Sequence, residues 1–281
     1  MNRNLFVTLL TLLTLLTITV IAPPVLAGPW TKDKGEFYAK VGEGTYLASA
    51  FRNADGETVE GSEYLSMTTF AYGEVGLLDG LHVQGYIPLL YARNRVERGT
   101  YTDFGLGDAS LGIQASPLKL AIPTSIRLDA KIPLYGAPPV GPGAQFVPAR
   151  GDGQIDLTTW LSTGAGTATY YFYADIGYQH RTTWSFDPGV VGPFSDGFVF
   201  QAQVGYSLFG QAILAIGTGG VLPLEQDTTS KGYVTVGPSL FYPVSDTIAL
   251  EAAGYGTPWS RNSAAGWAAN VGISFRGRVS D

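Results

Sequence analysis

The C-terminal part of the chain alternates apolar residues with small or polar ones, with a period of two, over Gly266–Phe275. Trp267, Val271 and Phe275 fall on the apolar face, and Asn270 falls on the other. Successive side chains of a β-strand point to opposite faces, so this pattern predicts a strand with two unlike faces. An unbroken apolar face beside a small, polar one is typical of a strand in a membrane-spanning β-barrel.

The same alternation recurs in seven further segments. They are residues 64–77, 81–89, 108–115, 126–134, 154–161, 170–179 and 198–208. Residues 211–225 are too uniformly small and apolar for faces to be assigned. In the segment 36–47, Glu43 stands on an otherwise apolar face, which a β-bulge or an exit from the hydrocarbon layer would accommodate.

Short and long connections alternate between the predicted strands. Short turns fall near residues 78–80, 117–121, 164–167, 209–210 and 245–246, and long loops near 53–61, 96–105, 136–153, 183–196, 226–232 and 259–265. The predicted fold is all-β: a transmembrane antiparallel up-and-down β-barrel of about 12 strands, with periplasmic turns and termini and external loops. A soluble β-sandwich is the alternative, but it would leave many apolar strand faces without a partner sheet.

The N-terminus carries the features of a secretory signal peptide. A basic residue, Arg3, precedes an apolar run from Leu5 to Ile21. The small residues Val25 and Ala27 suit cleavage after Ala27. An uncleaved membrane anchor is the alternative, although the apolar run is near the lower length limit for a membrane span.

The chain therefore divides into a signal peptide, residues 1–27, and a single outer-membrane barrel domain, residues 28–281. The strand pattern begins within about ten residues of the cleavage site, which leaves little chain for a plug domain. We expect the lumen to hold no N-terminal plug, and Gly28–Asp33 to lie outside it.

Charge and composition exclude several kinds of partner. Cleavage after Ala27 leaves 254 of the 281 residues, with all 23 acidic and 16 of the 17 basic residues, a net charge of −7. Such a chain lacks the basic surface that nucleic-acid binding requires. The absence of cysteine excludes disulfides, thiolate metal sites and a lipid anchor. No cofactor and no metal site are predicted.

Charged residues on the inward faces of the strands predict a polar lining for the pore. Six of them are expected to form one connected network, with Asp108 facing Lys131 and Asp156 facing Asp175: Asp108, Arg127, Asp129, Lys131, Asp156 and Asp175. The lining should continue through Gln179, Arg181, Gln201, Gln203, Glu251, Asn270 and Arg276. Such a belt either sets the field and width of the pore or only braces the barrel.

Aromatic residues near strand ends predict girdles at the two membrane interfaces, because their rings are apolar and many carry one polar group. The candidates are Trp30, Tyr91, Tyr135, Trp184, Phe186, Trp259 and Trp267. Burial within external loops is the alternative, chiefly for Trp184 and Phe186.

A catalytic role has little support in the sequence. His180 is predicted near the outer end of its strand on the lipid-facing side, with Thr182 two residues on. Hydrolysis needs an activated hydroxyl beside the histidine and a third, orienting group. The sequence places no outward carboxylate near His180. His82 is predicted to be a lumen residue, and two isolated histidines give no metal-ligand spacing. No catalytic residue is assigned.

Three motifs resemble a known family. Gly105–Gly112 and Gly151–Leu157 are similar to two recurring motifs of outer-membrane transporters labelled "MetA-pathway of phenol degradation", a porin-like group, and Trp30–Tyr38 is similar to the family's start. The resemblance implies a barrel that passes small, often aromatic or hydrophobic, molecules. One departure is that residues 276–281 follow Phe275, whereas outer-membrane barrels usually end on the aromatic that the assembly machinery recognises.

The sequence thus predicts a channel of the bacterial outer membrane that passes small molecules by passive diffusion through a polar-lined lumen. A structural or adhesive barrel with a closed lumen is the alternative, and a lipid hydrolase using His180 is a third. The expected partners are outer-membrane lipids, a small solute and the barrel assembly machinery. Neither the solute nor the oligomeric state follows from the sequence.

Overall fold

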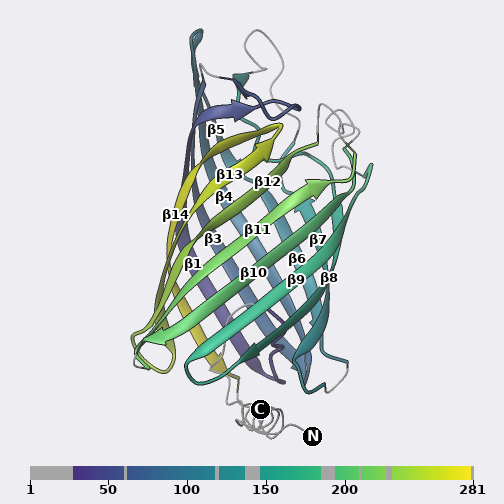
Figure 1. The fold of residues 1–281 in the computed structure, drawn as a ribbon, viewed down its shortest axis with the longest axis vertical. Coiled ribbons are helices and arrows are strands. Elements are labelled where there is room, and N and C mark those ends of the chain that lie inside the picture. The colour runs from purple at the N-terminus through teal and green to yellow at the C-terminus, as the bar shows by residue number, and fades with distance from the viewer. Residues whose placement is uncertain are drawn as a thin grey trace, which may run out of the picture.

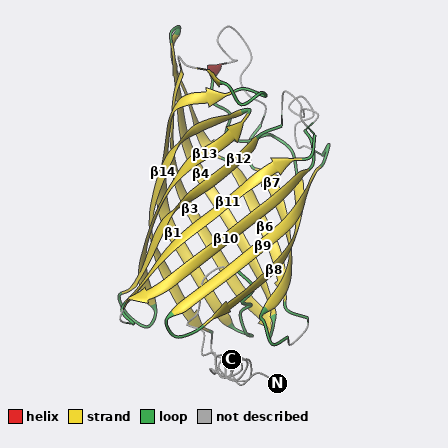
Figure 2. Cartoon of the chain, viewed as in Figure 1, coloured by secondary structure: helices red, strands yellow, loops and turns green. Residues whose placement is uncertain are grey.

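The computed structural model describes residues 28–59, 62–117, 120–136, 146–184, 194–208, 210–225 and 230–279. They form one antiparallel sheet that closes on itself where β14 pairs with β1 (Figures 1 and 2). The strands are β1 (Glu36–Arg52), β2 (Thr58–Val59), β3 (Ser62–Leu78), β4 (Leu81–Val96), β5 (Gly99–Leu106), β6 (Asp108–Ala115), β7 (Thr124–Pro133), β8 (Asp156–Gly166), β9 (Tyr170–Arg181), β10 (Gly197–Leu208), β11 (Ala212–Pro223), β12 (Gly232–Pro243), β13 (Ile248–Arg261) and β14 (Ser263–Arg278).

The barrel wall has twelve strands when β2 is left out and β5 and β6 are counted as one. This confirms the predicted fold class and strand number. β2 pairs only with the last two residues of β1 and is not a separate strand of the wall. β5 and β6 pair in turn with different halves of β4 and act as one wall strand that is interrupted at Gly107. The interruption lies opposite Pro88, which has no N–H for the ladder, and Gly107 N donates to the Pro88 carbonyl at 3.1 Å.

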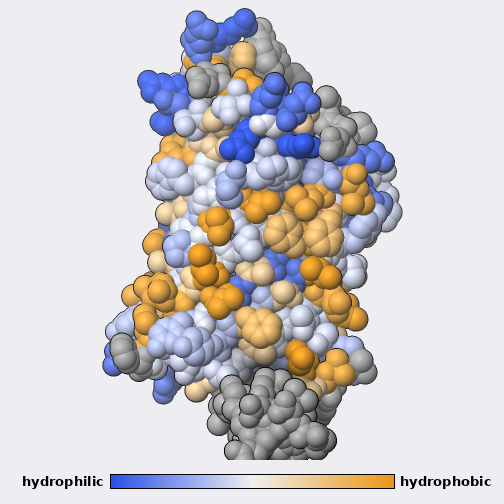
Figure 3. Space-filling view, viewed as in Figure 1, coloured by the Kyte–Doolittle hydropathy of each residue, from blue (hydrophilic) through white to orange (hydrophobic). Residues whose placement is uncertain are grey.

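Outward-facing side chains are largely apolar, as period two dictates. Leu111, Val204 and Val271 are each more than half exposed although they lie well inside long strands. Figure 3 shows hydrophobic residues over the middle of the visible face and hydrophilic ones gathered at one end. The buried hydrophobic cluster is small and lies inside the barrel, around Tyr171 and Tyr173. This distribution, with apolar side chains outside and polar ones inside, is the reverse of that in a soluble barrel.

Connections at the two ends differ as the sequence predicted, with two exceptions. We call the end with the short connections, such as Asp79–Gly80, the turn end, and the opposite end the loop end (Figure 1). The long loop expected over 259–265 is wrong, because only Asn262 separates β13 from β14. Asn262 has a φ of 46°, a left-handed conformation that asparagine tolerates better than most residues. The loop expected over 96–105 is instead a tight hairpin between β4 and β5.

The first and last described strands meet at the turn end, where Glu36 pairs with Arg278. The predicted signal peptide, residues 1–27, lies outside the described residues and stays a prediction. Within the described part of the chain, no helix has the length and apolar character needed to cross a membrane.

Candidate functional site in the barrel lumen

The lumen contains two cavities that meet at a pair of aromatic rings. A cavity of about 780 Å³ lies toward the loop end, and one of about 500 Å³ lies toward the turn end. We call them the loop-side and turn-side chambers. Phe70 and Tyr86 line both, and their ring centroids are 5.8 Å apart. The chambers therefore follow one another along the barrel, with this pair of rings between them.

Aromatic and uncharged polar side chains line the loop-side chamber. Its tyrosines come from five strands: Tyr46, Tyr64, Tyr86, Tyr233 and Tyr255. The Tyr46 hydroxyl donates to the Ala264 carbonyl at 2.8 Å. Lys231 is the only charged residue in the described lining, and its Nζ lies 2.7 Å from Asp152 Oδ1. This lining therefore offers apolar rings and polar groups, and its one charge is paired.

An ion pair on the wall of the turn-side chamber joins β1 to β13 over the intervening strand β14. Lys40 Nζ lies 2.6 Å from Glu251 Oε2, and the Tyr38 hydroxyl donates to Glu251 Oε1 at 2.5 Å. The Lys40 ammonium also lies 5.7 Å from the centroid of the Phe70 ring. The predicted lining residue Glu251 is thus part of a charged group at the junction of the two chambers.

A second charged group on the wall of the turn-side chamber is centred on Arg127. Its Nε lies 2.9 Å from Asp129 Oδ2, and its guanidinium lies 4.8 Å from the centroid of the Trp160 ring. Arg127 Nη1 lies 4.0 Å from Oδ2 of Asp175, a fully buried carboxylate that also accepts a hydrogen bond from Gln201. One guanidinium therefore lies beside two carboxylates and can balance the charge of one of them.

The expectation that Gly28–Asp33 would lie outside the lumen is wrong. Gly28 and Trp30 line the turn-side chamber, and the Gly28 carbonyl accepts a hydrogen bond from Gln114 Nε2 at 2.9 Å. Lys32 N donates to His82 Nδ1 at 3.3 Å, and Lys32 Nζ lies 3.0 Å from Glu74 Oε2. The lumen wall supplies polar partners for this short segment. The alternation of strand residues could not predict these contacts, because the segment lies before the first strand.

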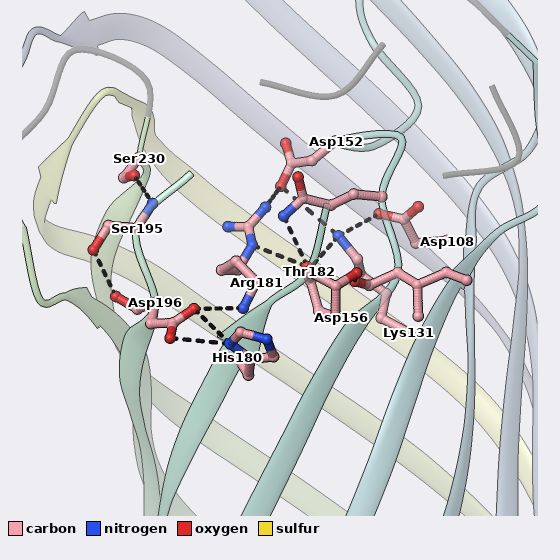
Figure 4. A network of polar contacts seen from close by, with 12 residues as sticks. Asp108, Lys131, Asp152, Asp156, His180, Arg181, Thr182, Ser195, Asp196 and Ser230 are labelled. Carbon is pink, nitrogen blue, oxygen red and sulfur yellow. Dashed lines mark hydrogen bonds and ion pairs between the residues drawn. The ribbon is translucent and has the colours of Figure 1, made fainter. Parts of the chain in front are cut away.

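A salt-bridge cluster lies at the loop end, where β7, β8 and β9 reach the loops (Figure 4). Lys131 Nζ is 2.7 Å from Asp156 Oδ2 and 3.5 Å from Asp108 Oδ2. Arg181 joins Asp156 at 3.1 Å and Asp152 at 2.8 Å. Asp156 is almost fully buried, so the cluster excludes water from its centre. It fastens the connection before β8 to the barrel wall.

Asp152, in that connection, has a depressed pKa. Burial alone would raise the pKa of its carboxyl, but Lys231, Lys131 and Arg181 together hold it well below the usual range. A depressed folded-state pKa contributes stability above the unfolded pKa of about 3.9, and the contribution is lost as pH falls through the folded value.

We therefore expect Asp152→Asn to destabilise the folded barrel at pH 7 and to have a much smaller effect near pH 2. Urea unfolding of the variant and the parent chain at both pH values checks this. An equal destabilisation at the two pH values would contradict the ion-pair account.

The predicted registers are wrong, although the predicted faces are those observed. Asp108 pairs with Pro133 and not with Lys131, and Asp156 pairs with Arg181 and not with Asp175. Both hairpins turn at a different point from the one expected, and the shifts are even numbers of residues, which preserve the face. The six charged residues fall into two groups, around Lys131 and around Arg127, and not into one network.

The remaining predicted lining residues lie at different heights. Gln203 accepts from the Tyr171 hydroxyl at 2.6 Å in the turn-side chamber, and Asn270 lines the loop-side chamber. Gln179 pairs with Gly197 near the loop end. Arg276 lies at the turn-end rim, where its Nε donates to the Asp246 carbonyl at 2.9 Å, so it contributes to the mouth and not to the chamber walls.

Two of the predicted interface aromatics lie inside the barrel. Trp30 packs edge-on against Tyr173, with centroids 6.4 Å apart, and the Tyr135 hydroxyl donates to Asp108 at 2.8 Å. Sequence position alone cannot distinguish a ring at the membrane interface from one in the lumen, because both sites favour an apolar body with a polar group.

The other predicted aromatics lie on or near the outer wall. Trp184 and Trp267 are exposed, and Tyr91 is half-buried beside Met67. Trp259 is half-buried near the loop end, with the Arg261 guanidinium 5.9 Å from its ring centroid. Phe186 lies outside the described residues.

His180 has a carboxylate partner that the sequence analysis missed. Its Nδ1 lies 3.1 Å from both carboxylate oxygens of Asp196, which also accepts from the Tyr178 hydroxyl (Figure 4). Thr182, the expected neighbouring hydroxyl, donates to the Ile155 carbonyl instead. The geometry orients the imidazole, but the Thr182 hydroxyl that was expected as its nucleophile is engaged elsewhere.

Sequence reasoning also missed Asp152, Lys231 and Lys40 as lumen residues, and it placed Glu74 on the inward face without including it in the lining. Asp152 and Lys231 lie in connections, where period two says nothing about direction. Lys40 has inward parity on β1, so its place in the lumen could have been predicted.

The fold and its chambers define a barrel of the outer-membrane type. No protein-family model and no curated protein matches the sequence. The COG4313 outer membrane channel from Pseudomonas putida F1 superposes with a TM-score of 0.66 at 11% identity, over 91% of this chain and 100% of that chain.

Two further solved structures share the architecture. The NanC porin superposes with a TM-score of 0.51 at 10% identity, over 84% of this chain and 98% of that one. The translocator domain of the autotransporter NalP from Neisseria meningitidis gives 0.51 at 11% identity, over 88% and 90%. A channel, a porin and a translocator share this fold, so the likeness shows the fold alone.

Proposed function

We propose that the chain is a channel of the bacterial outer membrane, with both termini in the periplasm, through which small molecules diffuse passively. The observation that carries the proposal is the succession of two chambers inside one closed barrel. The apolar outer face supports a membrane location.

The lining favours small, uncharged solutes. Rings and uncharged polar groups line the loop-side chamber, and its one lysine is paired with Asp152. Lys40 and Glu251 neutralise each other at the junction below. An ion would lose hydration free energy there and would find no unpaired charge to compensate the loss. An uncharged solute would lose less hydration free energy. The resemblance to the "MetA-pathway of phenol degradation" group extends the proposal to aromatic or hydrophobic solutes.

Liposome swelling with refolded residues 28–281 tests the proposal. We expect an uncharged pentose to enter faster than a singly charged sugar acid of similar size. Protein-free liposomes and liposomes with heat-denatured protein are the controls. Swelling no faster than in the controls would contradict a channel, and equal rates for the two solutes would contradict the preference for uncharged molecules.

A structural barrel with a closed lumen is the second candidate, because Gly28 and Trp30 occupy part of the turn-side chamber. A closed-lumen barrel predicts no permeation even when substitutions remove the contacts that hold this segment against the wall. A lipid hydrolase has less support, because the Thr182 hydroxyl is engaged with a backbone carbonyl and not with His180. We therefore propose that the chain is not an enzyme.

A further inference from the structure

Glu43 lies on the outer face of β1, and neither explanation considered from the sequence accounts for it. The pairing of β1 with β3 runs without interruption from Phe37 to Ala48. The irregularity in β1 falls at Ala48–Ala50, five residues further on, on its β14 side. A β-bulge therefore does not turn this carboxylate inward.

Apolar side chains surround Glu43 toward both ends of the barrel. Val271, its direct partner on β14, is 60% exposed. Val41 and Ile273 are exposed toward the turn end, and Met67 and Trp267 are exposed toward the loop end. The carboxylate thus stands inside the apolar belt and not beyond its edge. The other acidic residues of the described strands have inward parity or, as with Glu36 and Glu63, lie near strand ends.

The carboxylate has one hydrogen-bond donor. Thr69 Oγ1, directly across on β3, donates to Glu43 Oε1 at 2.6 Å. Among the described residues, no ion pair includes Glu43 and no donor reaches its Oε2. An ionisable side chain facing lipid is costly and is therefore rare unless it has a function or a partner.

We propose that this surface, made of Glu43, Thr69, Thr45, Ala71 and Ala269, binds a second copy of the same chain within the membrane. The proposal rests on the membrane location given above and concerns assembly, not permeation. Copies inserted by one pathway have the same orientation, so a two-fold axis along the membrane normal brings Glu43 of each copy to the same depth.

The chemistry of the surface is complementary to itself. A protonated Glu43 carboxyl of one copy can donate to the free Oε2 of the other, while each Thr69 holds Oε1. Hydrocarbon chains offer no such donor, and lipid headgroups lie outside the belt. The small residues Thr45, Ala71 and Ala269 allow two barrel walls to approach closely, as small residues do between membrane helices.

Single-cysteine crosslinking tests the interface, since the chain has no cysteine of its own. Ala71→Cys places a thiol beside Glu43, and Ile176→Cys on β9 places one on a distant part of the outer wall as a matched control. After oxidation in outer membranes, we expect disulfide-linked dimers from Ala71→Cys at several times the yield from Ile176→Cys. Equal yields, or a crosslinked product of another mass, would overturn the proposal.

A second pair of variants tests Glu43 itself in the Ala71→Cys background. Glu43→Gln keeps a donor and an acceptor and should retain most of the crosslinking, whereas Glu43→Leu should lower it several-fold. Heat-modifiable migration in gels verifies that both barrels fold. An unchanged yield with Glu43→Leu would overturn the role of the carboxyl. Swelling rates measured on the same variants report on the channel independently.

Discussion

Replacing Trp30 and Lys32 together with alanine is expected to raise single-channel conductance several-fold. The two side chains hold the N-terminal segment in the turn-side chamber. Trp30 packs against Tyr173, and Lys32 pairs with Glu74, whose carboxylate is nearly buried. Without these contacts, the segment loses two of its main attachments to the wall, and the freed cross-section becomes available to ions. Planar-bilayer recording of the refolded barrel measures the change.

Lys34→Ala is the matched control, because Lys34 directly follows the segment and its side chain is exposed. Its conductance should equal that of the parent chain. If the double variant also conducts like the parent, the segment does not limit the pore. If neither protein conducts at all, the closed-lumen barrel becomes the better account.

Asp156→Asn is expected to cost about 3 kcal/mol of folding free energy, the scale for removing one partner from a buried ion pair. Asp156 lies between Lys131 and Arg181, and all three side chains are largely buried. The amide keeps the volume of the carboxylate but removes the buried charge that lies between the two cations. Urea unfolding in lipid vesicles measures the difference.

The comparison variant for this second prediction is Asp55→Asn, an exposed acidic residue in the connection between β1 and β2. It should change the unfolding free energy by less than about 0.5 kcal/mol, as surface substitutions usually do. A loss with Asp156→Asn no larger than this would show that water in the lumen screens the cluster. A changed ion preference in the same variant would show that the cluster also acts on permeation.

The period-two alternation predicted well which side chains point into the lumen, because a register shift of two residues leaves each side chain on the same face of the sheet. Lys131 and Asp156 were placed inward correctly in this way. The residue expected directly opposite each on the next strand was wrong, although the Lys131 ammonium still reaches Asp108. Register depends on where each hairpin turns, and the turns near residues 117–121 and 164–167 have no sequence feature that fixes their centre. Partners in the lumen therefore require the structure.

Segments outside the strands were predicted least well. Trp30 was expected at the membrane surface and packs in the lumen, because a short stretch before the first strand has no periodicity to orient it. Asp152 and Asp196 became partners of Arg181 and His180 through the folding of connections. Their identity as acids was visible in the sequence, but their direction was not.

The join between the two ends of the chain has a consequence for biogenesis. β14 pairs with β1 over sixteen residue pairs, and these are the first and last strands of the described residues. The cylinder cannot close until β14 pairs with β1, and an assembly intermediate without that pairing presents open ladder edges that invite aggregation. A chain truncated within β14 should therefore fail at the last step of barrel closure, as a nearly complete sheet without its last strand. We expect periplasmic proteases to degrade it.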